Sequence, residues 1–209
     1  MARMAAKDRR EVLIDAALRV MTREGVAKAT TRTIVHEAGM NLGAFHYCFD
    51  SREALLHEVI TRVTDNSVAK ARKAFAAETD LRCAISNGLQ SFWEGVELAP
   101  GEHLAGYELA HYALRQPGME DLARRQYGHF LEVIEELFTE AAASANIQWN
   151  VPVSILARYL NSVLDGLTLC WLVDRDSERS REVLGMTADY LMTLVDKPAR
   201  TEAESTTAV

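Results

Sequence analysis

The chain has 209 residues, of which 48% are hydrophobic and 25% are charged, and it carries a net charge of −7. These proportions are typical of globular proteins and exclude a collagen-like fibre, a low-complexity protein and a disordered chain. The best apolar stretch, from Val163 to Val173, contains Asp165 and is much shorter than the ~20 residues of a membrane-spanning helix. We therefore expect one ordinary domain, with or without a small attachment, and no membrane partner.

The N-terminal segment and the cysteines indicate the compartment. The first residues, MARMAAKDRREV, are basic, but no apolar stretch follows them, which argues against a signal peptide. Cys48, Cys83 and Cys170 are odd in number and far apart, and they form no CxxC pair. We expect reduced thiols in the cytoplasm, with no metal site and no cofactor.

The charge is unevenly distributed along the chain. Residues 1–52 contain nine basic and six acidic residues, a net charge of +3. The remaining residues contain 14 basic and 24 acidic ones, a net charge of −10. A basic N-terminal part on an acidic remainder is typical of a nucleic-acid reader with a separate regulatory part. A chance fluctuation would also explain +3, so charge alone leaves both interpretations open.

Four helices are predicted in the first 75 residues. Apolar residues recur every three or four positions between about residues 7 and 24, and again in the segments that follow. Glycines end helices and hydroxyl or amide side chains cap them. These boundary residues are Gly25, Thr30 or Thr31, Gly39, Asn41, and Asp50 or Ser51.

Five further helices are predicted after Asp80. Their approximate ranges are 81–99, 102–114, 119–144, 152–173 and 178–196, with a loop from Asn146 to Pro152. Alternating β-branched residues with hairpin turns are not found, so the predicted fold class is all-α, with about nine helices. Residues 198–209 are polar and are expected to be disordered.

The stretch from Thr31 to Phe49, TRTIVHEAGMNLGAFHYCF, predicts a helix-turn-helix. Two short helices are separated by only three or four residues around Gly39. The second helix presents an outward surface made of Asn41, Leu42, Ala44, His46 and Tyr47. A short helix of this kind can insert its N-terminal end into the major groove of DNA.

Residues 10–56 resemble the DNA-binding region of the TetR/AcrR family of transcriptional repressors. The matching stretches are VLIDAALRVMTREG (12–25), ATTRTIVHEAG (29–39) and NLGAFHYCFDSREALL (41–56). The resemblance implies a helix-turn-helix head at residues 1–52, a helical effector-binding and dimerisation body at 53–197, and a tail at 198–209. The chain departs from the family at three positions, where Val35 replaces the usual Ala, His46 the usual Tyr and Arg52 the usual Lys.

The resemblance also implies DNA-binding roles for individual residues. Phosphate contacts are implied for Thr31, Thr33, Tyr47 and Arg52. Base edges are expected to face Asn41, Leu42 and Ala44, while His46 would meet a base or a phosphate. Packing by Tyr47, capping by Thr31 and a solvated Arg52 are the alternatives, and Arg3, Lys7, Arg9 and Arg10 form either a DNA-contacting arm or a solvated terminus.

His103, Tyr107 and His111 are spaced one turn apart on one helical face. The two histidines are ~12 Å apart along a straight helix, too far to share one zinc ion bound at ~2.0–2.1 Å. Either a pocket lining or ordinary packing explains the face. The sequence has no motif for a catalytic nucleophile, a phosphate loop or a dinucleotide site, so we do not expect an enzyme.

The predicted helix at 152–173 is apolar around most of its circumference, which predicts a dimer interface. One apolar stripe consists of Leu156, Leu160, Val163, Leu167 and Trp171. A surface this wide suggests a core on one side and a second subunit on the other, with the last helix as its partner in a four-helix bundle. The alternative is a monomer in which this helix is fully central.

A ligand pocket is predicted among the fifth to seventh helices. The candidate lining residues are mostly apolar or aromatic, with a few polar groups, as in ligand pockets generally. They are Phe92, Trp93, Tyr107, His111, Gln126, Tyr127 and Phe130. The same residues could simply form a core. Together with the resemblance, they predict a cytoplasmic, homodimeric repressor that binds a palindromic double-stranded DNA operator and is released by a small-molecule effector. A helical protein-interaction module and a helical enzyme, neither binding DNA, are the alternatives.

Overall fold

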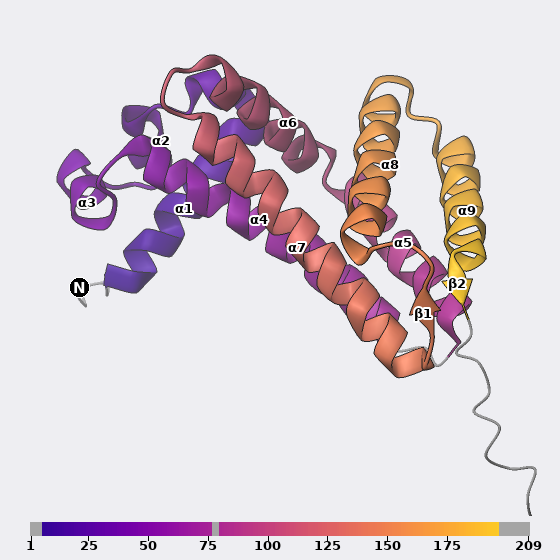
Figure 1. Cartoon of the computed structure of the whole chain (residues 1–209). Coiled ribbons are helices and arrows are strands. Elements are labelled where there is room, and N and C mark those ends of the chain that lie inside the picture. Colours follow the sequence, from indigo (N-terminus) through magenta and orange to yellow (C-terminus); the bar gives the residue numbers. More distant parts are fainter. Residues whose placement is uncertain (1–5, 77–79, 197–209) are drawn as a thin grey trace, which may run out of the picture.

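The computed structural model describes residues 6–76 and 80–196, which form the all-α fold that the sequence predicts (Figure 1). The helices are α1 (Ala6–Glu24), α2 (Thr31–Glu37), α3 (Leu42–Cys48), α4 (Arg52–Ala76), α5 (Leu81–Leu98), α6 (Pro100–Arg115), α7 (Glu120–Ala145), α8 (Val153–Asp174) and α9 (Ser177–Thr193). A 3-10 turn, η1 (Val26–Lys28), and two short strands, β1 (Gln148–Trp149) and β2 (Val195–Asp196), complete the described part. Arg3 and the predicted tail at 198–209 lie outside it.

Helices α1 to α3 form a head at one end of the molecule (Figure 1). Thr30 is the N-cap of α2, because its side chain accepts a hydrogen bond from the Thr33 N–H. Asn41 caps α3 in the same way, through the N–H of Ala44. Between the two helices Gly39 has a φ of 64°, a conformation that other residues adopt only with strain. The predicted helix-turn-helix is therefore present.

The core of the head extends beyond residue 52, where the sequence places the domain boundary. Leu55 and Leu56 of α4 are fully buried in the same apolar cluster as Leu13 of α1 and Ile34 of α2. Leu109 of α6 is fully buried there as well. Because one core joins these helices, the head is packed directly onto α4 and α6 of the body.

The body has a second core, formed by α5, α7, α8 and α9. Trp93, Leu156 and Leu191 are almost completely buried in it, and the rings of Trp93 and Trp171 meet edge to face at 5.8 Å. The long helices α4 and α7 run from the head along the body (Figure 1). Among the described residues, no helix has the length and apolar character to cross a membrane.

The strands and the 3-10 turn η1 are elements that the sequence does not predict. The segment expected to be a loop contains β1, and α9 ends at Thr193, so that Val195 can pair with Trp149 in an antiparallel register. The Trp149 indole donates a hydrogen bond to the Phe138 carbonyl at 2.9 Å and fixes β1 on α7. Strands of two residues are too short to produce a recognisable alternation.

Candidate functional site

Helix α3 presents an exposed surface at the tip of the head. Tyr47 is 68% exposed and Leu42 is 43% exposed, although both side chains are largely apolar. Asn41 and His46 are also exposed, and Ala44 is half-buried. Phe45, on the opposite side of α3, is buried. The helix is thus held by its inner side and leaves its outer side available for contact.

The two polar atoms of the Asn41 side chain have different roles. Its Oδ1 accepts a hydrogen bond from the Ala44 N–H at 2.9 Å, so the oxygen stabilises the helix. The amide nitrogen is left to donate outward. A donor at the N-terminal end of a major-groove helix can read the acceptors on a base edge.

The two threonines predicted to contact phosphate differ in how their side chains are used. The Thr33 hydroxyl donates within the head, to the Lys28 carbonyl at 2.6 Å. Thr31 is the half-buried first residue of α2. The Thr33 hydroxyl is therefore already engaged within the head.

The structure gives Arg52 a role different from the expected phosphate contact. Its guanidinium donates hydrogen bonds to the Ala29 carbonyl at 2.7 Å and to the Val26 carbonyl at 2.8 Å, and it lies over the ring of Tyr112, 5.3 Å from the centroid. These partners engage the guanidinium of this half-buried residue within the same molecule. Arg52 therefore ties the turn before α2 to α4 and α6.

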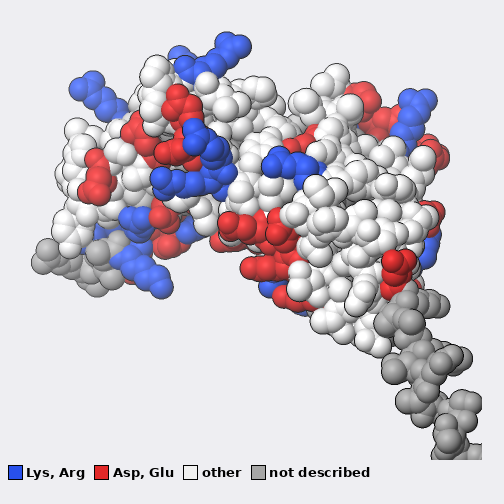
Figure 2. All heavy atoms as spheres, in the orientation of Figure 1, with Lys and Arg blue, Asp and Glu red and all other residues white. Residues whose placement is uncertain are grey.

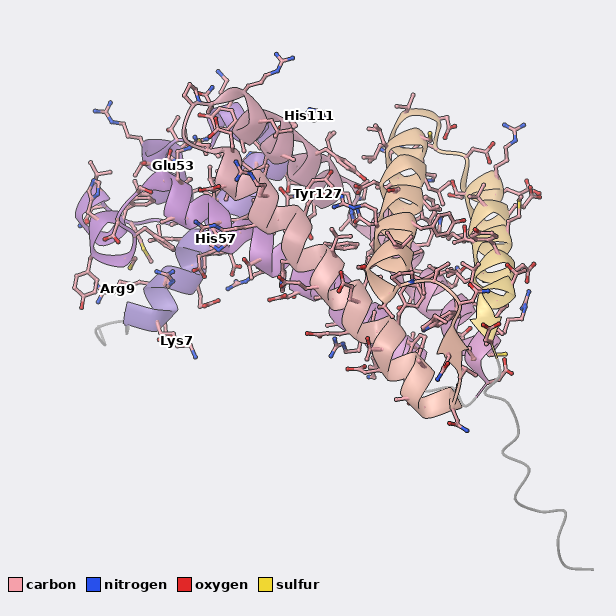
Figure 3. The ribbon with its side chains drawn as sticks, in the orientation of Figure 1. Lys7, Arg9, Glu53, His57, His111 and Tyr127 are labelled. Atoms are coloured by element: carbon pink, nitrogen blue, oxygen red, sulfur yellow. The ribbon has the colours of Figure 1, made fainter. Side chains whose placement is uncertain are left out.

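Other basic side chains lie on the face of the head seen in Figure 2, interspersed with acidic ones. The Arg9 guanidinium, labelled in Figure 3, lies 5.0 Å from the centre of the Tyr47 ring. Arg10 donates instead to the Cys48 carbonyl and to Glu58, at 2.8 Å each, and so belongs to the head's internal contacts. Of the expected arm, Arg9 is thus beside the exposed surface of α3.

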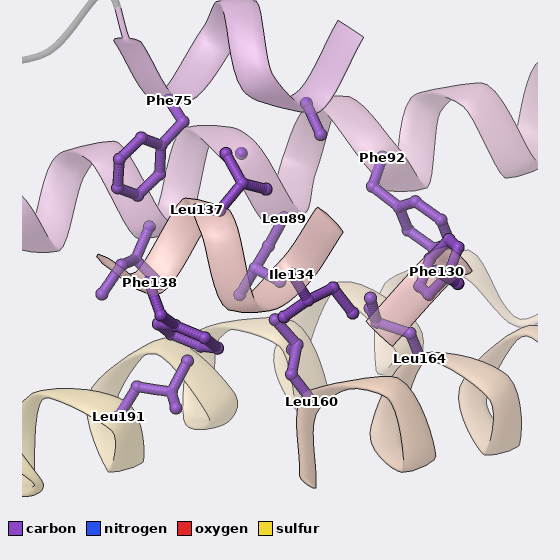
Figure 4. A pocket seen from close by; sticks show the side chains of 13 residues that line it. Phe75, Leu89, Phe92, Phe130, Ile134, Leu137, Phe138, Leu160, Leu164 and Leu191 are labelled. Carbon is purple, nitrogen blue, oxygen red and sulfur yellow. The ribbon is translucent and has the colours of Figure 1, made fainter. Parts of the chain in front are cut away.

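The body contains an apolar cavity of about 70 Å³ (Figure 4). Helices α4, α5, α7, α8 and α9 all contribute to its walls. The larger side chains around it are Phe75, Leu89, Phe92, Phe130, Ile134, Leu137, Phe138, Leu160, Leu164 and Leu191. Phe92 and Phe130 also line a second cavity, of about 90 Å³, so the two spaces adjoin.

The second cavity is the polar one, and Asp165 is among the residues that line it. The Tyr107 hydroxyl lies 3.1 Å from the Asp165 carbonyl oxygen and 3.4 Å from its Oδ1. Burial raises the pKa of the Asp165 carboxyl, although hydrogen bonds from Tyr127, Tyr107 and Asn161 oppose that rise. Burial first, and the nearby carboxylate second, raise the pKa of Tyr127 to about 12 and that of Tyr107 well above its usual range.

His103 also lines this polar cavity. Burial lowers the pKa of its imidazole to about 4, so the ring is neutral near pH 7. Its ring meets that of Phe92 edge to face, with 5.9 Å between the centroids. Among residues 6–76 and 80–196, no group of three or more His, Cys, Asp or Glu side chains could hold a metal ion.

The predicted pocket residues separate into two groups. Phe92, Tyr107, Gln126, Tyr127 and Phe130 line the cavities. The other two predictions are corrected. Trp93 is completely buried, with its indole N–H on Glu97 at 3.0 Å, and His111 is exposed on α6 (Figure 3). Asp165 is the main residue that the sequence does not assign to the pocket, because it is isolated in an apolar helix. For His103 the sequence leaves a pocket lining and ordinary packing open, and the residue lines the polar cavity.

The predicted dimer stripe on α8 mostly faces inward, which is a second correction. Leu156 and Trp171 are buried in the body's own core, Leu160 lines the apolar cavity, and Val163 and Leu167 are half-buried. The exposed apolar residues lie elsewhere on α8 and α9. They are Ile155, Leu169, Val173, Val183, Met186 and Tyr190.

Two family profiles match the chain. The profile of bacterial regulatory proteins of the tetR family matches residues 13–59, which contain the helix-turn-helix. The profile of the BetI-type transcriptional repressor C-terminal region matches residues 94–196, which contain most of the body. The head and the body are thus matched by regions of the same kind of regulator.

Known proteins resemble the chain over nearly its full length. The nicotine-responsive transcriptional repressor HdnoR of Paenarthrobacter nicotinovorans is 29% identical over 87% of this chain and 92% of its own. A TetR transcription regulator from Haloarcula marismortui has the same fold, with a TM-score of 0.72, 18% identity, and coverage of 91% of this chain and all of its own. The fatty acid degradation regulator FadR from Bacillus halodurans aligns with a TM-score of 0.69 and 16% identity, over 88% of this chain and 94% of its own.

Proposed function

The chain belongs to the TetR family of bacterial transcriptional regulators, and we propose that it is a homodimeric repressor that binds a palindromic operator and is released from it by a small molecule. The observation that carries the proposal is that α4 belongs to the core of the head, which holds α3, and also lines both cavities of the body. A change of shape around the cavity can therefore reach the DNA-binding surface.

Contact with DNA is proposed for the exposed side of α3 and its surroundings. The outward amide of Asn41 and the side chain of His46 would meet base edges in the major groove. Tyr47, with Arg9 over its ring, would meet the phosphate backbone. The phosphate role of Thr31 and the base-facing positions of Leu42 and Ala44 remain part of the proposal.

Release by an effector is proposed for the two adjoining cavities. Both are small, at about 70 and 90 Å³, compared with the ~300–1,000 Å³ of most ligand sites. A ligand must therefore push helices apart when it enters. Helix α4 contributes to both cavities and also to the core of the head, so widening them would move the head. The name of the relative HdnoR, a nicotine-responsive repressor, supports control by a small organic molecule.

Dimerisation is proposed through the exposed apolar faces of α8 and α9. Leu169 and Val173 lie one turn apart on α8, and Met186 and Tyr190 lie one turn apart on α9. Pairing these helices with those of a second copy would bury both faces in a four-helix bundle. Two heads in one dimer would then reach successive major grooves, ~34–36 Å apart on one face of the DNA.

The experiment is a mobility shift on the DNA upstream of the gene, run at several salt concentrations. We expect a sequence-specific complex with two protomers per site, and a Tyr47→Ala variant should lose it while a Leu114→Ala variant keeps it. Leu114 is a suitable control because it is 64% exposed and lies on α6, outside the head surface and the cavities. Absence of any specific shift would exclude the repressor and favour an interaction module.

A further inference from the structure

We propose that the two adjoining cavities recognise an amphiphilic organic cation, with a protonated amine beside Asp165 and its apolar part between Phe92 and Phe130. The inference rests on the effector role proposed above and specifies the chemical class of the effector. Four observations carry it: the charge of the lining, the geometry around Asp165, an unpaired acceptor, and the contrast between the two cavities.

The charge of the lining selects a cation. Asp165 is the one carboxylate that lines either cavity, and no Lys or Arg of the described residues lines them. The other group that could become positive, His103, is neutral near pH 7 because burial lowers its pKa to about 4. An anionic headgroup would therefore be desolvated beside a carboxylate with no compensating positive charge, which is strongly unfavourable.

The geometry around Asp165 leaves room for another donor. Its Oδ1 lies 3.4 Å from the Tyr107 hydroxyl and its Oδ2 lies 3.3 Å from the Asn161 amide nitrogen, and Tyr127 is the third donor to the carboxylate. Both distances exceed the ~2.7–2.9 Å of a hydrogen bond between charged groups, and two carboxylate oxygens can accept about four bonds. Among the described residues, no ion pair involves Asp165. An ammonium group would supply the missing counter-charge.

Gln126 adds an acceptor without a partner. Its Nε2 donates to the Gly106 carbonyl at 3.4 Å, but its Oε1 is buried and has no hydrogen-bond partner in the described part of the chain. This side chain lines the same polar cavity as Asp165. A buried acceptor that lacks a donor is unfavourable, and an N–H of a bound amine would relieve that cost.

The apolar cavity explains why the cation must also be apolar. Every side chain around it is apolar, and Phe92 and Phe130 lie at one end of it (Figure 4). The same two residues also line the polar cavity. The rings of Phe92 and Phe130 are 6.3 Å apart, edge to face. An alkyl or aryl group attached to the amine would occupy this region, and the neighbouring rings would further favour the positive charge.

The test compares three ligands that differ only in their headgroup: phenylbutylamine, phenylbutanol and phenylbutyrate, titrated calorimetrically at pH 7. The amine is protonated at this pH, the alcohol is neutral and the acid is anionic. We expect the wild-type protein to bind the amine at least about tenfold more tightly than the alcohol, as a charge-assisted hydrogen bond provides, and the carboxylate weakest of all. Binding of none of the three, equal binding of amine and alcohol, or preference for the carboxylate would overturn the proposal.

Asp165→Asn identifies the group responsible, because it removes the charge and keeps the shape. It should weaken amine binding about tenfold or more and leave alcohol binding unchanged. The matched control is Asp174→Asn, an equal change of charge at an exposed position on the same helix. An Asp165→Asn variant that binds the amine like the wild type contradicts the proposal. The wild-type comparison does not require this variant to fold, so the test does not depend on it.

The same titrations, repeated with operator DNA present, separate this inference from the proposed repressor function. Selective amine binding without any specific DNA complex would contradict the repressor and leave the ligand class intact. A specific complex on DNA, together with a cavity that does not prefer the amine, would contradict the ligand class alone.

Discussion

The Oε2 atom of Glu108, in α6, accepts a hydrogen bond from the backbone N–H of Val26 at 2.9 Å. The bond joins the body to the turn between α1 and α2. Gly25 precedes this turn with a φ of 85°, and a Cβ atom there would lie 3.0 Å from the same carboxylate oxygen. The carboxylate and the glycine together hold the head in one position relative to α6.

Removal of this carboxylate should destabilise the protein. In Glu108→Ala the N–H of Val26, a residue that is only 2% exposed, would lose its acceptor. We expect a loss of about 1–3 kcal/mol in the free energy of unfolding, measured by urea denaturation. His111→Ala, one turn further along α6 and exposed, should change stability by less than about 0.5 kcal/mol. Equal stability of the two variants would show that the bond does not contribute.

Arg52→Ala distinguishes a structural role from a phosphate contact. Because the guanidinium donates to two backbone carbonyls, its loss should lower the free energy of unfolding by about 1.5–3 kcal/mol. Operator affinity should also fall, but the slope of log affinity against log salt should stay unchanged. A slope reduced by about 0.9, the contribution of one phosphate contact, would restore the role that the family resemblance implies.

Two substitutions at Asn41 separate capping from base recognition. Asn41→Ala removes both the cap oxygen and the outward amide, so it should lower stability by about 0.5–2 kcal/mol and also alter operator preference. Asn41→Ser keeps a good cap and loses only the amide donor. It should retain stability, yet change discrimination at one operator position by about 1–3 kcal/mol, measured by competition with mutated operators. Unchanged discrimination in both variants would remove Asn41 from base recognition.

Charge introduced on the exposed faces of α8 and α9 should prevent dimerisation. Leu169→Glu and Met186→Glu place an unpaired carboxylate in the proposed apolar interface, at positions that are 50% and 70% exposed in one protomer. Sedimentation velocity should show folded monomers that no longer bind the operator tightly. Leu114→Glu, at a position on α6 that is 64% exposed, should remain dimeric. A dimer that survives both interface variants would place the interface elsewhere.

His103 makes stability depend on pH. Its folded-state pKa is about 4, against an ordinary value of 6.5, so the unfolded chain takes up a proton that the folded chain rejects. This histidine therefore does not lower the free energy of unfolding above pH 6.5. As the pH falls from 6.5 towards 4, the free energy of unfolding decreases by up to about 1.4 kcal/mol per pH unit. In urea denaturation, lowering the pH from 7 to 5 should cost the wild type about 2 kcal/mol more than His103→Gln. Identical pH dependence in both proteins would mean that His103 is not held neutral.

The helices and the helix-turn-helix could be predicted from the residue pattern because they depend on neighbours within about one turn. The hydroxyl of Thr30 and the amide oxygen of Asn41 each accept a hydrogen bond from the N–H three residues later and so cap their helices. The positive φ of Gly39 likewise depends only on its own residue type. The outward residues of α3 follow from the same 3.6-residue period. The family resemblance, itself carried by these residues, was confirmed by the profile matches.

Contacts between distant parts of the chain could not be predicted in this way. Helical periodicity identifies an apolar stripe, but it cannot tell whether Leu156 or Leu169 faces the core, because both faces of α8 are apolar. The polar cavity depends on Tyr107 and Asp165, which are 58 positions apart and meet only when α6 and α8 pack together. Arg52 likewise has its carbonyl partners more than 20 residues away. Local energies fix where helices begin and end, whereas packing across the whole chain decides which side chains share a site.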